Sequence, residues 1–420
     1  MDDNSNADVD APMVLEFPGS LCALVELRGF ERTDPQLVAL EFVAASIQDM
    51  KSIEDVYVAL EHVHDALMSL GAYSAVDLLL DESERQPGRL AVKCTAVEKK
   101  LFGLQAGTFV QGDQGTIEAS GHVRNVFGRC ETIAATVEQG LSNNTYQVSV
   151  TVPRVYQKPW HLDVKASQVF QNDSKWASYV QRLRSVSWSL WSEDGVSVGY
   201  ELGWRTLSDP SGVASPSIVT YLGESIKSSA KMTLAGNGLV TNVEVGGLLD
   251  FCKASFGGGV AVELSDTTEL VLEGSTGLIV GSAGPADRFH LGGIVPWGSM
   301  RGFQTCGVGP FDKRRRPSAG RLRDALGGKC LCSLFSALRF DMPSPTMRAL
   351  GVRGQIFLQA GVNESGLKEA VKISNWRGST GVGLVVGTAL GLLEVNVCAA
   401  LASHITDMKT GVQFGLTPGA

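Results

Sequence analysis

The chain has 420 residues, with 36 Lys or Arg against 44 Asp or Glu, and a formal net charge of −8. This acidic balance argues against broad nucleic-acid binding, which normally needs a basic surface. Glycine is unusually frequent, with 48 residues, whereas proline contributes only 15. Glycine spread through apolar stretches is typical of strands that bend and twist within a closing sheet.

The eight cysteines follow no regular spacing and lack the His partners of a zinc site. We interpret them as reduced structural thiols, and we expect no metal and no cofactor. The first ten residues are acidic, unlike a basic transit peptide or a signal sequence with an apolar core. We therefore expect residues 1–20 to be a disordered lead and the protein to be made in the cytosol without a cleavable address.

Residues 21–100 have the pattern of a small α/β domain. A strand is expected at 23–28, and Thr33 is a candidate cap for a helix that continues to about residue 46. Ser52 is a candidate cap for a second helix, which Gly71 ends. Strands at 76–80 and 90–97 would complete a β-α-α-β-β order. The second helix has one apolar stripe at steps of three and four residues, which predicts a core-facing side: Ile53, Val56, Leu60, Val63, Leu67 and Leu70.

From about residue 101 the helical period stops and apolar and polar residues alternate. Clear alternation occurs at 146–152, 161–167, 196–205, 352–359 and 411–416. Strands with one apolar and one polar face fit a transmembrane β-barrel, although a soluble β-sandwich alternates in the same way. The 320 residues after the first domain allow sixteen strands at roughly 20 residues each with their turns.

Residues 382–402 are long enough to cross a bilayer as a helix. Glu394 and Asn396 within this stretch would be costly in hydrocarbon. Alternation explains the stretch better, because Val382 and Leu384 share one face and the two polar residues share another. The sequence therefore favours a β-hairpin here.

The most specific stretch is FHLGGIVPWGSMRGFQTCGVGP, residues 289–310. It resembles the signature of the BamA-type outer-membrane assembly family, in which an F-x-LGG strand leads to an RGF turn on a long, inward-folded loop. The resemblance assigns the tip of that loop to Met300, Arg301, Gly302 and Phe303. Arg301 would reach the polar barrel wall, Gly302 would permit a tight turn, and Phe303 would anchor the tip.

Three further resemblances follow in the family's order. The domain at 21–100 is similar to a single POTRA module, 125–131 to an N-x-x-G-R-x-E stretch, and 221–229 to a strand containing S-[LI]-K-S-S. One POTRA domain is typical of the central barrel subunit of the mitochondrial sorting and assembly machinery (SAM). The implied fold is a sixteen-stranded transmembrane barrel at 101–420 behind one POTRA domain.

The last expected strand also matches the sorting signal of mitochondrial barrel precursors, polar-x-Gly-x-x-apolar-x-apolar. The matching positions are Lys409, Gly411, Phe414 and Leu416. The strand that meets the loop arginine usually carries Asp or Asn, but here Gln359 stands in that place. Gln359 can accept a hydrogen bond without charge assistance, and Glu394 is a hypothetical source of the missing charge.

Two other departures from the family pattern concern loops. The stretch 231–250 looks shortened, so a loop or strand end is expected to be missing. The basic run 313–316 is interpreted as a solvated loop, with lipid-headgroup contact as the alternative.

The resemblance implies that the protein inserts barrel precursors through a lateral gate between its first and last strands. No nucleotide or catalytic residue is required, because the folded product satisfies its own backbone in lipid. Expected partners are precursors with a C-terminal sorting signal, metaxin-like peripheral subunits and membrane lipids, but no nucleic acid. The POTRA domain would lie in the intermembrane space. The expected gate residues, whose glycines would weaken packing at the seam, are Leu101, Gly103, Gly107, Gly411, Phe414 and Leu416.

Three other functions remain open at this point. One is a plastid or bacterial protein-translocation pore; a second POTRA-like repeat would favour this function, and the sequence shows none. Another is a porin-type diffusion channel, which leaves the first domain and the RGF loop unexplained. An enzyme is the weakest, since no P-loop, H-E-x-x-H or G-x-S-x-G motif is present.

Overall fold

The computed structural model describes residues 13–17, 21–50, 52–83, 87–111, 114–140, 143–155, 158–247, 250–295, 298–318, 321–388 and 391–417. By its contacts the chain divides into two compact units. The first contains residues 1–105 with 120–135 and 148–164, and the second contains 106–119, 136–147 and 165–420.

A four-stranded sheet and two helices form the N-terminal module. The strand order is β1-β2-β4-β3, with β2 parallel to β4 and the other pairs antiparallel. The elements are β1 (Met13–Glu16), β2 (Cys22–Arg28), α1 (Pro35–Ala44), a short 3-10 turn (Ile47–Asp49), α2 (Ile53–Ser69), β3 (Tyr73–Glu82) and β4 (Leu90–Glu98).

Strand β1 was not expected. Its residues pair antiparallel with Leu24–Leu27 of β2, and Leu15 packs against the core of the module. The apolar run of β1 thus gains both backbone hydrogen bonds and burial. Disorder throughout residues 1–20 is therefore wrong for 13–16, while 1–12 and 18–20 lie outside the described residues.

One of the two predicted helix caps is confirmed and the other is wrong. Ser52 caps α2 as predicted, because its side chain accepts a hydrogen bond from the Glu54 amide. Thr33 does not cap α1. Asp34 takes that position and accepts from the Gln36 amide, with Pro35 at the first helical position. Thr33 instead donates its hydroxyl to Glu98 at 2.7 Å.

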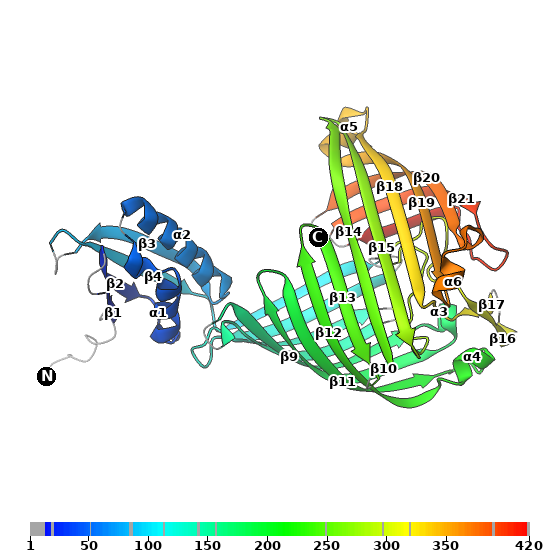
Figure 1. Cartoon of the computed structure of the whole chain (residues 1–420), viewed down its shortest axis with the longest axis horizontal. Helices are drawn as coiled ribbons and strands as arrows, with labels where there is room; N and C mark the ends of the chain where they lie inside the picture. The colour runs from blue at the N-terminus through cyan, green and yellow to red at the C-terminus, as the bar shows by residue number, and fades with distance from the viewer. Residues whose placement is uncertain are drawn as a thin grey trace. The chain divides into compact units, whose positions relative to one another are not determined.

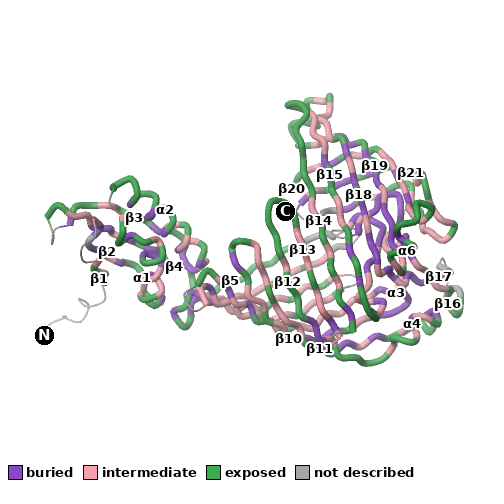
Figure 2. Tube along the Cα trace, in the orientation of Figure 1, coloured by how far each residue is buried: buried purple, intermediate pink, exposed green. Residues whose placement is uncertain are grey.

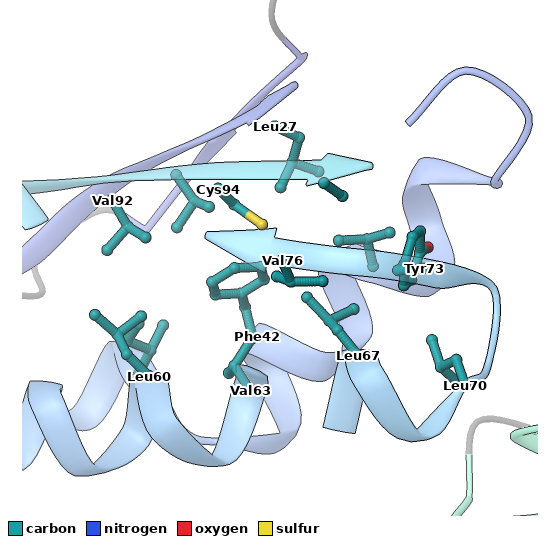
Figure 3. Close-up of a cluster of buried hydrophobic side chains, with 14 of the residues drawn as sticks. Leu27, Phe42, Leu60, Val63, Leu67, Leu70, Tyr73, Val76, Val92 and Cys94 are labelled. Atoms are coloured by element: carbon teal, nitrogen blue, oxygen red, sulfur yellow. The ribbon is translucent and has the colours of Figure 1, made fainter. Parts of the chain in front are cut away.

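The apolar stripe of α2 forms the core of the module. Leu60, Val63 and Leu67 point toward Val92 and Cys94 on the sheet, as Figure 3 shows. These side chains are at most 5% exposed. Ile53, at the first helical position, is 53% exposed and lies outside the core, contrary to the prediction.

The remaining chain builds the predicted sixteen-stranded antiparallel sheet, which runs in sequence order from β5 at one end to β22 at the other. In Figure 1, β18 to β21 lie side by side, with α5 at one end of these strands and α6 toward the other. The strands are β5 (Phe102–Gln111), β6 (Gln114–Arg124), β7 (Thr132–Gly140), β8 (Asn143–Val152), β9 (Trp160–Asn172), β10 (Val180–Ser192), β11 (Val196–Ser208), β12 (Gly223–Gly236), β13 (Leu239–Gly246), β14 (Phe251–Ser265), β15 (Thr268–Gly281), β18 (Cys330–Asp341), β19 (Val352–Glu364), β20 (Arg377–Thr388), β21 (Gly391–Ala402) and β22 (Val412–Thr417).

Short elements occupy the connections. Strands β16 and β17 form a separate two-stranded ribbon between β15 and β18. The bounds are α3 (Ser174–Ala177), α4 (Pro216–Val219), β16 (Phe311–Ser318), β17 (Arg321–Ala325), α5 (Pro345–Ala349), α6 (Leu367–Ala370) and a 3-10 turn (Ile373–Asn375).

The hairpin interpretation of 382–402 is confirmed. Strands β20 and β21 pair antiparallel across this stretch. Glu394 and Asn396 are at most 1% exposed, whereas Val395 and Val397 on the opposite face are 46% and 58% exposed. Among the described residues, none of the helices combines the length and the apolar character needed to span a bilayer.

The stretch 231–250, apart from 248–249 outside the described residues, contains the end of β12, a short turn and the eight-residue strand β13. Strands β12 and β13 join through a two-residue turn at Asn237 and Gly238, both with positive φ, of 50° and 74°. Such a pair matches the right-handed twist of a hairpin. The short connection and the short strand agree with the expectation of a shortened stretch.

Glu98 at the end of β4 gives the N-terminal module a pH-dependent contact. Its carboxylate accepts hydrogen bonds from Thr33 and Arg32, and its side chain is only 6% exposed. Burial opposes ionisation, but these hydrogen bonds outweigh it and hold the pKa of Glu98 below its ordinary value. The module should therefore gain stability from Glu98 above pH 4.5 and lose it as the pH falls through the lower, folded-state pKa.

We expect Glu98→Gln to remove this part of the acid sensitivity. Thermal unfolding followed by circular dichroism at about 222 nm, to which the two long helices contribute, would measure it between about pH 3 and pH 7. An unchanged acid dependence in the variant would contradict the assignment.

Candidate functional site

A long segment between β15 and β16, residues 282–310, folds back on itself and is called the inward loop here. Isolated bridges join Leu291 to Val308 and Gly293 to Met300. Leu291, Met300, Phe303 and Val308 are at most 3% exposed and pack with Phe251 and Ile279 of the barrel wall. Figure 2 shows buried positions gathered along β18 and β19, on the part of the sheet that contacts this loop. The loop is thus packed as core.

Arg301 at the loop tip forms a bidentate ion pair with Glu394 of β21. Its Nε and one terminal nitrogen lie 2.8 and 2.7 Å from the two carboxylate oxygens. Both side chains are at most 5% exposed. The parallel geometry is the strongest form of such a pair and fixes direction as well as distance.

Neighbouring groups complete the shell around this ion pair. Asn396 and Gln355 donate to Glu394 at 2.7 and 3.2 Å. The guanidinium lies over the ring of Phe335, 3.9 Å from the ring centre, and its remaining terminal nitrogen has no hydrogen-bond partner among the described residues. A buried pair of this kind tolerates the loss of either partner poorly.

Gln359 and Glu394 lie where the loop-partner hypothesis places them. Gln359 accepts from the Arg301 amide at 2.9 Å and donates to the Ser299 carbonyl at 2.7 Å. Glu394 supplies the charge that Gln359 lacks. Sequence reasoning missed Gln355 and Asn396, although alternation along their strands places them on the same inner face.

The loop tip also holds the last strand. Gln413 of β22 accepts from the Gly302 amide at 2.8 Å and donates to the Phe303 carbonyl at 2.5 Å. Thr410 donates its amide to the Gly302 carbonyl at 3.0 Å. Gly302 has φ of +84°, and a Cβ there would lie 3.1 Å from Ser379 Cβ. The turn therefore favours glycine.

A second part of the loop pairs with the chain just before β22. Gln304 donates its amide to the Met408 carbonyl at 2.8 Å, and Met408 donates to Gly307 at 2.9 Å. A bridge joins Phe303 to Lys409. The segment that resembles a sorting signal thus begins with residues bound by the inward loop.

Two further ion pairs lie within the loop and just beyond it. Asp287 accepts two hydrogen bonds from Arg205, at 2.6 and 2.7 Å. Beyond the loop, Arg314 pairs with Asp324 at 2.7 Å, and Asp324 is fully buried. The run 313–316 thus lies in β16 rather than in a loop, and Arg314 forms a buried contact, but Lys313, Arg315 and Arg316 are exposed as the solvated interpretation predicts.

The three glycines of the expected gate, together with Gly415 of the last strand, fall into two classes. A Cβ at Gly103 would collide with the His122 ring, and one at Gly415 would lie 2.9 Å from Ile294 Cβ. Side chains therefore cover these two glycines, contrary to the expectation of weakened packing. At Gly107 and Gly411 an added Cβ would meet nothing within 4 Å, so these two fit the expectation better.

The other gate positions are described in part. Leu101 is half-buried just before β5. Phe414 is 57% exposed on the apolar face of β22. Leu416 pairs with Leu393 through its backbone, but its side chain lies outside the described residues.

The motif at 125–131 forms the turn between β6 and β7. Asn125 accepts from the Cys130 amide at 2.9 Å and donates to the Thr33 hydroxyl at 2.8 Å. Glu131 accepts from the amides of Phe127 and Arg129. These bonds explain why Asn and Glu suit this turn. The motif at 221–229 leads into β12, where Lys227 pairs with Glu201 at 2.9 Å.

Comparisons with known proteins agree with this geometry. Residues 223–417 match the Omp85 superfamily domain. A SAM50-like protein of Schizosaccharomyces pombe is 25% identical over 87% of this chain and 82% of its own length. The sorting and assembly machinery component 50 homolog of Xenopus tropicalis is 26% identical over 96% of this chain and 91% of its own.

Among solved structures, BamA from Haemophilus ducreyi lacking POTRA domains 1–3 has a similar fold. Its TM-score is 0.71 at 15% identity, over 93% of this chain and 82% of that one. The chain is therefore homologous to the SAM50 proteins over most of its length, contains an Omp85 superfamily domain at 223–417, and shares its fold with BamA, which together identify it as an outer-membrane β-barrel protein.

Proposed function

We propose that this protein inserts and assembles β-barrel precursors in the mitochondrial outer membrane, through a lateral opening between β5 and β22. The homology to sorting and assembly machinery proteins supports the general activity. The observation that carries the proposal is that the inward loop holds β22, at the end of the sheet, through Gly302, Phe303 and Gln413.

The length of β22 supports a weak seam. It pairs with β21 over six positions, whereas β10 and β11 pair over twelve. Strand β5, at the other end of the sheet, has ten residues, whereas β22 has six. If the two strands pair at the seam, part of β5 therefore has no partner strand for its backbone hydrogen bonds. Unpaired backbone groups on a strand edge can template an incoming strand.

The contacts with the inward loop distinguish the two strands of such a seam. Strands β21 and β22 are fixed to the inward loop by Glu394 and Gln413, so the β5 side is the one expected to move. A precursor's last strand would pair with the released β5, and later strands would follow until the new barrel separates. The folded product satisfies its own backbone in lipid, so no nucleotide is required.

The expected location is the mitochondrial outer membrane, and the expected partners are precursors and peripheral subunits. The N-terminal module would lie in the intermembrane space and hold precursors that carry a C-terminal sorting signal. Metaxin-like subunits would bind at the membrane surface. The homology to eukaryotic sorting and assembly machinery components supports the mitochondrial location.

The test is depletion of the protein followed by import into isolated mitochondria. Assembly of a radiolabelled porin precursor should fail, while import of a matrix-targeted control persists. Restoring the wild-type chain should restore assembly. If both precursors behave as before depletion, the mitochondrial assignment is wrong, and a plastid or bacterial pore or a diffusion channel would replace it.

A further inference from the structure

The outer face of the barrel carries two exposed arginines near the first residue of β10. Along β10, Leu183 and Ser185 are buried inward, whereas Arg182 and Arg184 are exposed on the opposite face. The next outward residues are Val186 and Trp188, which are also exposed. The face thus changes from basic to apolar within one strand.

The strand register brings an aromatic and an apolar side chain beside these arginines. Arg184 stands abreast of Trp204 on β11, and Trp204 abreast of Ile226 on β12. Trp204 and Ile226 are 61% and 67% exposed. With Arg182, these residues line a hollow of about 650 Å³ on the outer face.

Among the described residues, Arg182 and Arg184 form no ion pair that would balance their charges. Arg184 donates to the Gln168 side chain at 2.8 Å, which orients the guanidinium and leaves its charge in place. Arg205 also lines the hollow but is paired with Asp287. Glu224 is the one acidic residue of the lining, and in the described part of the chain it forms no ion pair with either exposed arginine.

We propose that Arg182, Arg184 and Trp204 form a binding site for the headgroup of an anionic phospholipid. A charge on the lipid-facing side of a barrel is costly at the middle of the bilayer and tolerated near its surface, so the arginines mark the headgroup level. A guanidinium binds phosphate oxygens through two parallel hydrogen bonds. Tryptophan is enriched at this level, and the apolar side chains beyond it suit acyl chains.

Native mass spectrometry of the full-length protein, with equal amounts of phosphatidylglycerol and phosphatidylcholine, tests the site. The wild type should retain phosphatidylglycerol selectively. Arg184→Gln should lower its retention about fivefold and the double variant with Arg182→Gln by more, given the usual contribution of a basic residue at an anionic surface. Glu224→Gln should raise retention, because it removes the opposing charge.

Arg348→Gln is the matched control, since it removes an exposed arginine from α5 at the opposite ends of the strands. It should retain lipid as the wild type does. Heat-modified mobility on a gel verifies that each variant is folded. If the double variant does not fold, the lipid retention of Glu224→Gln tests the proposal instead. Equal retention of both lipids, no gain with Glu224→Gln, or displacement of the lipid by inorganic phosphate would overturn the proposal.

Discussion

Replacing Arg301 with Leu should undock the inward loop and destabilise the barrel by about 3–5 kcal/mol, because Glu394 would remain buried without its cation. Glu394→Leu should cost a similar amount for the reciprocal reason. The double variant should lose less than the sum of the two, since it leaves neither charge unpaired. Precursor assembly should fail in both single variants, because β21 loses its ion pair with the loop and the undocked loop no longer holds β22.

The temperature at which the barrel loses its heat-modified gel mobility would measure stability, and protease cleavage within 282–310 would report loop release. Arg353→Gln provides the control. Its ion pair with Glu269 has the same charge type but is 31% exposed on the arginine side, and such pairs contribute little. Equal effects of Arg301→Leu and Arg353→Gln would contradict a special role for the loop pair.

Local patterns predicted much of this architecture. Alternation placed Glu394 and Gln359 on the inner wall, and the RGF motif placed Arg301 at the loop tip. Their meeting could therefore be hypothesised without coordinates. The stripe of α2 likewise predicted its buried face, apart from Ile53 at the exposed first turn.

Other contacts left no local trace in the sequence. Arg205 and Asp287 are 82 residues apart, and neither lies in a pattern that names its partner. The ring of His122 over Gly103 depends on strand register, which alternation alone does not fix. Strand β1 was missed because its four residues are too few to show a period. These features depend on contacts between distant parts of the chain. The sequence does not show that side chains cover Gly103 and Gly415, so both glycines were predicted to weaken the packing at the seam.

Substitutions at two glycines, Gly302 at the tip of the inward loop and Gly411 just before β22, distinguish the stability of the barrel from its sorting. Gly302→Ala should destabilise the assembled barrel by about 1–3 kcal/mol, because a non-glycine residue is strained at its φ of +84°. Gly411→Ala should leave that stability unchanged, since nothing lies within 4 Å of the added Cβ and its φ is not in the left-handed region. If 409–416 acts as a sorting signal, Gly411→Ala should instead slow the chain's own assembly.

The two quantities can be measured on the same pair of variants. Gel mobility after heating reports the stability of the assembled barrel, and import of the radiolabelled chain into wild-type mitochondria reports its rate of assembly. A Gly411→Ala chain that assembles at the wild-type rate would remove the sorting role from this strand while leaving the loop contacts intact. A Gly302→Ala barrel as heat-stable as the wild type would show that the loop tip does not depend on its left-handed turn. The anchor of β22 would then rest on the hydrogen bonds between the loop and the chain around Gln413 and on the Arg301–Glu394 pair, rather than on glycine at the turn.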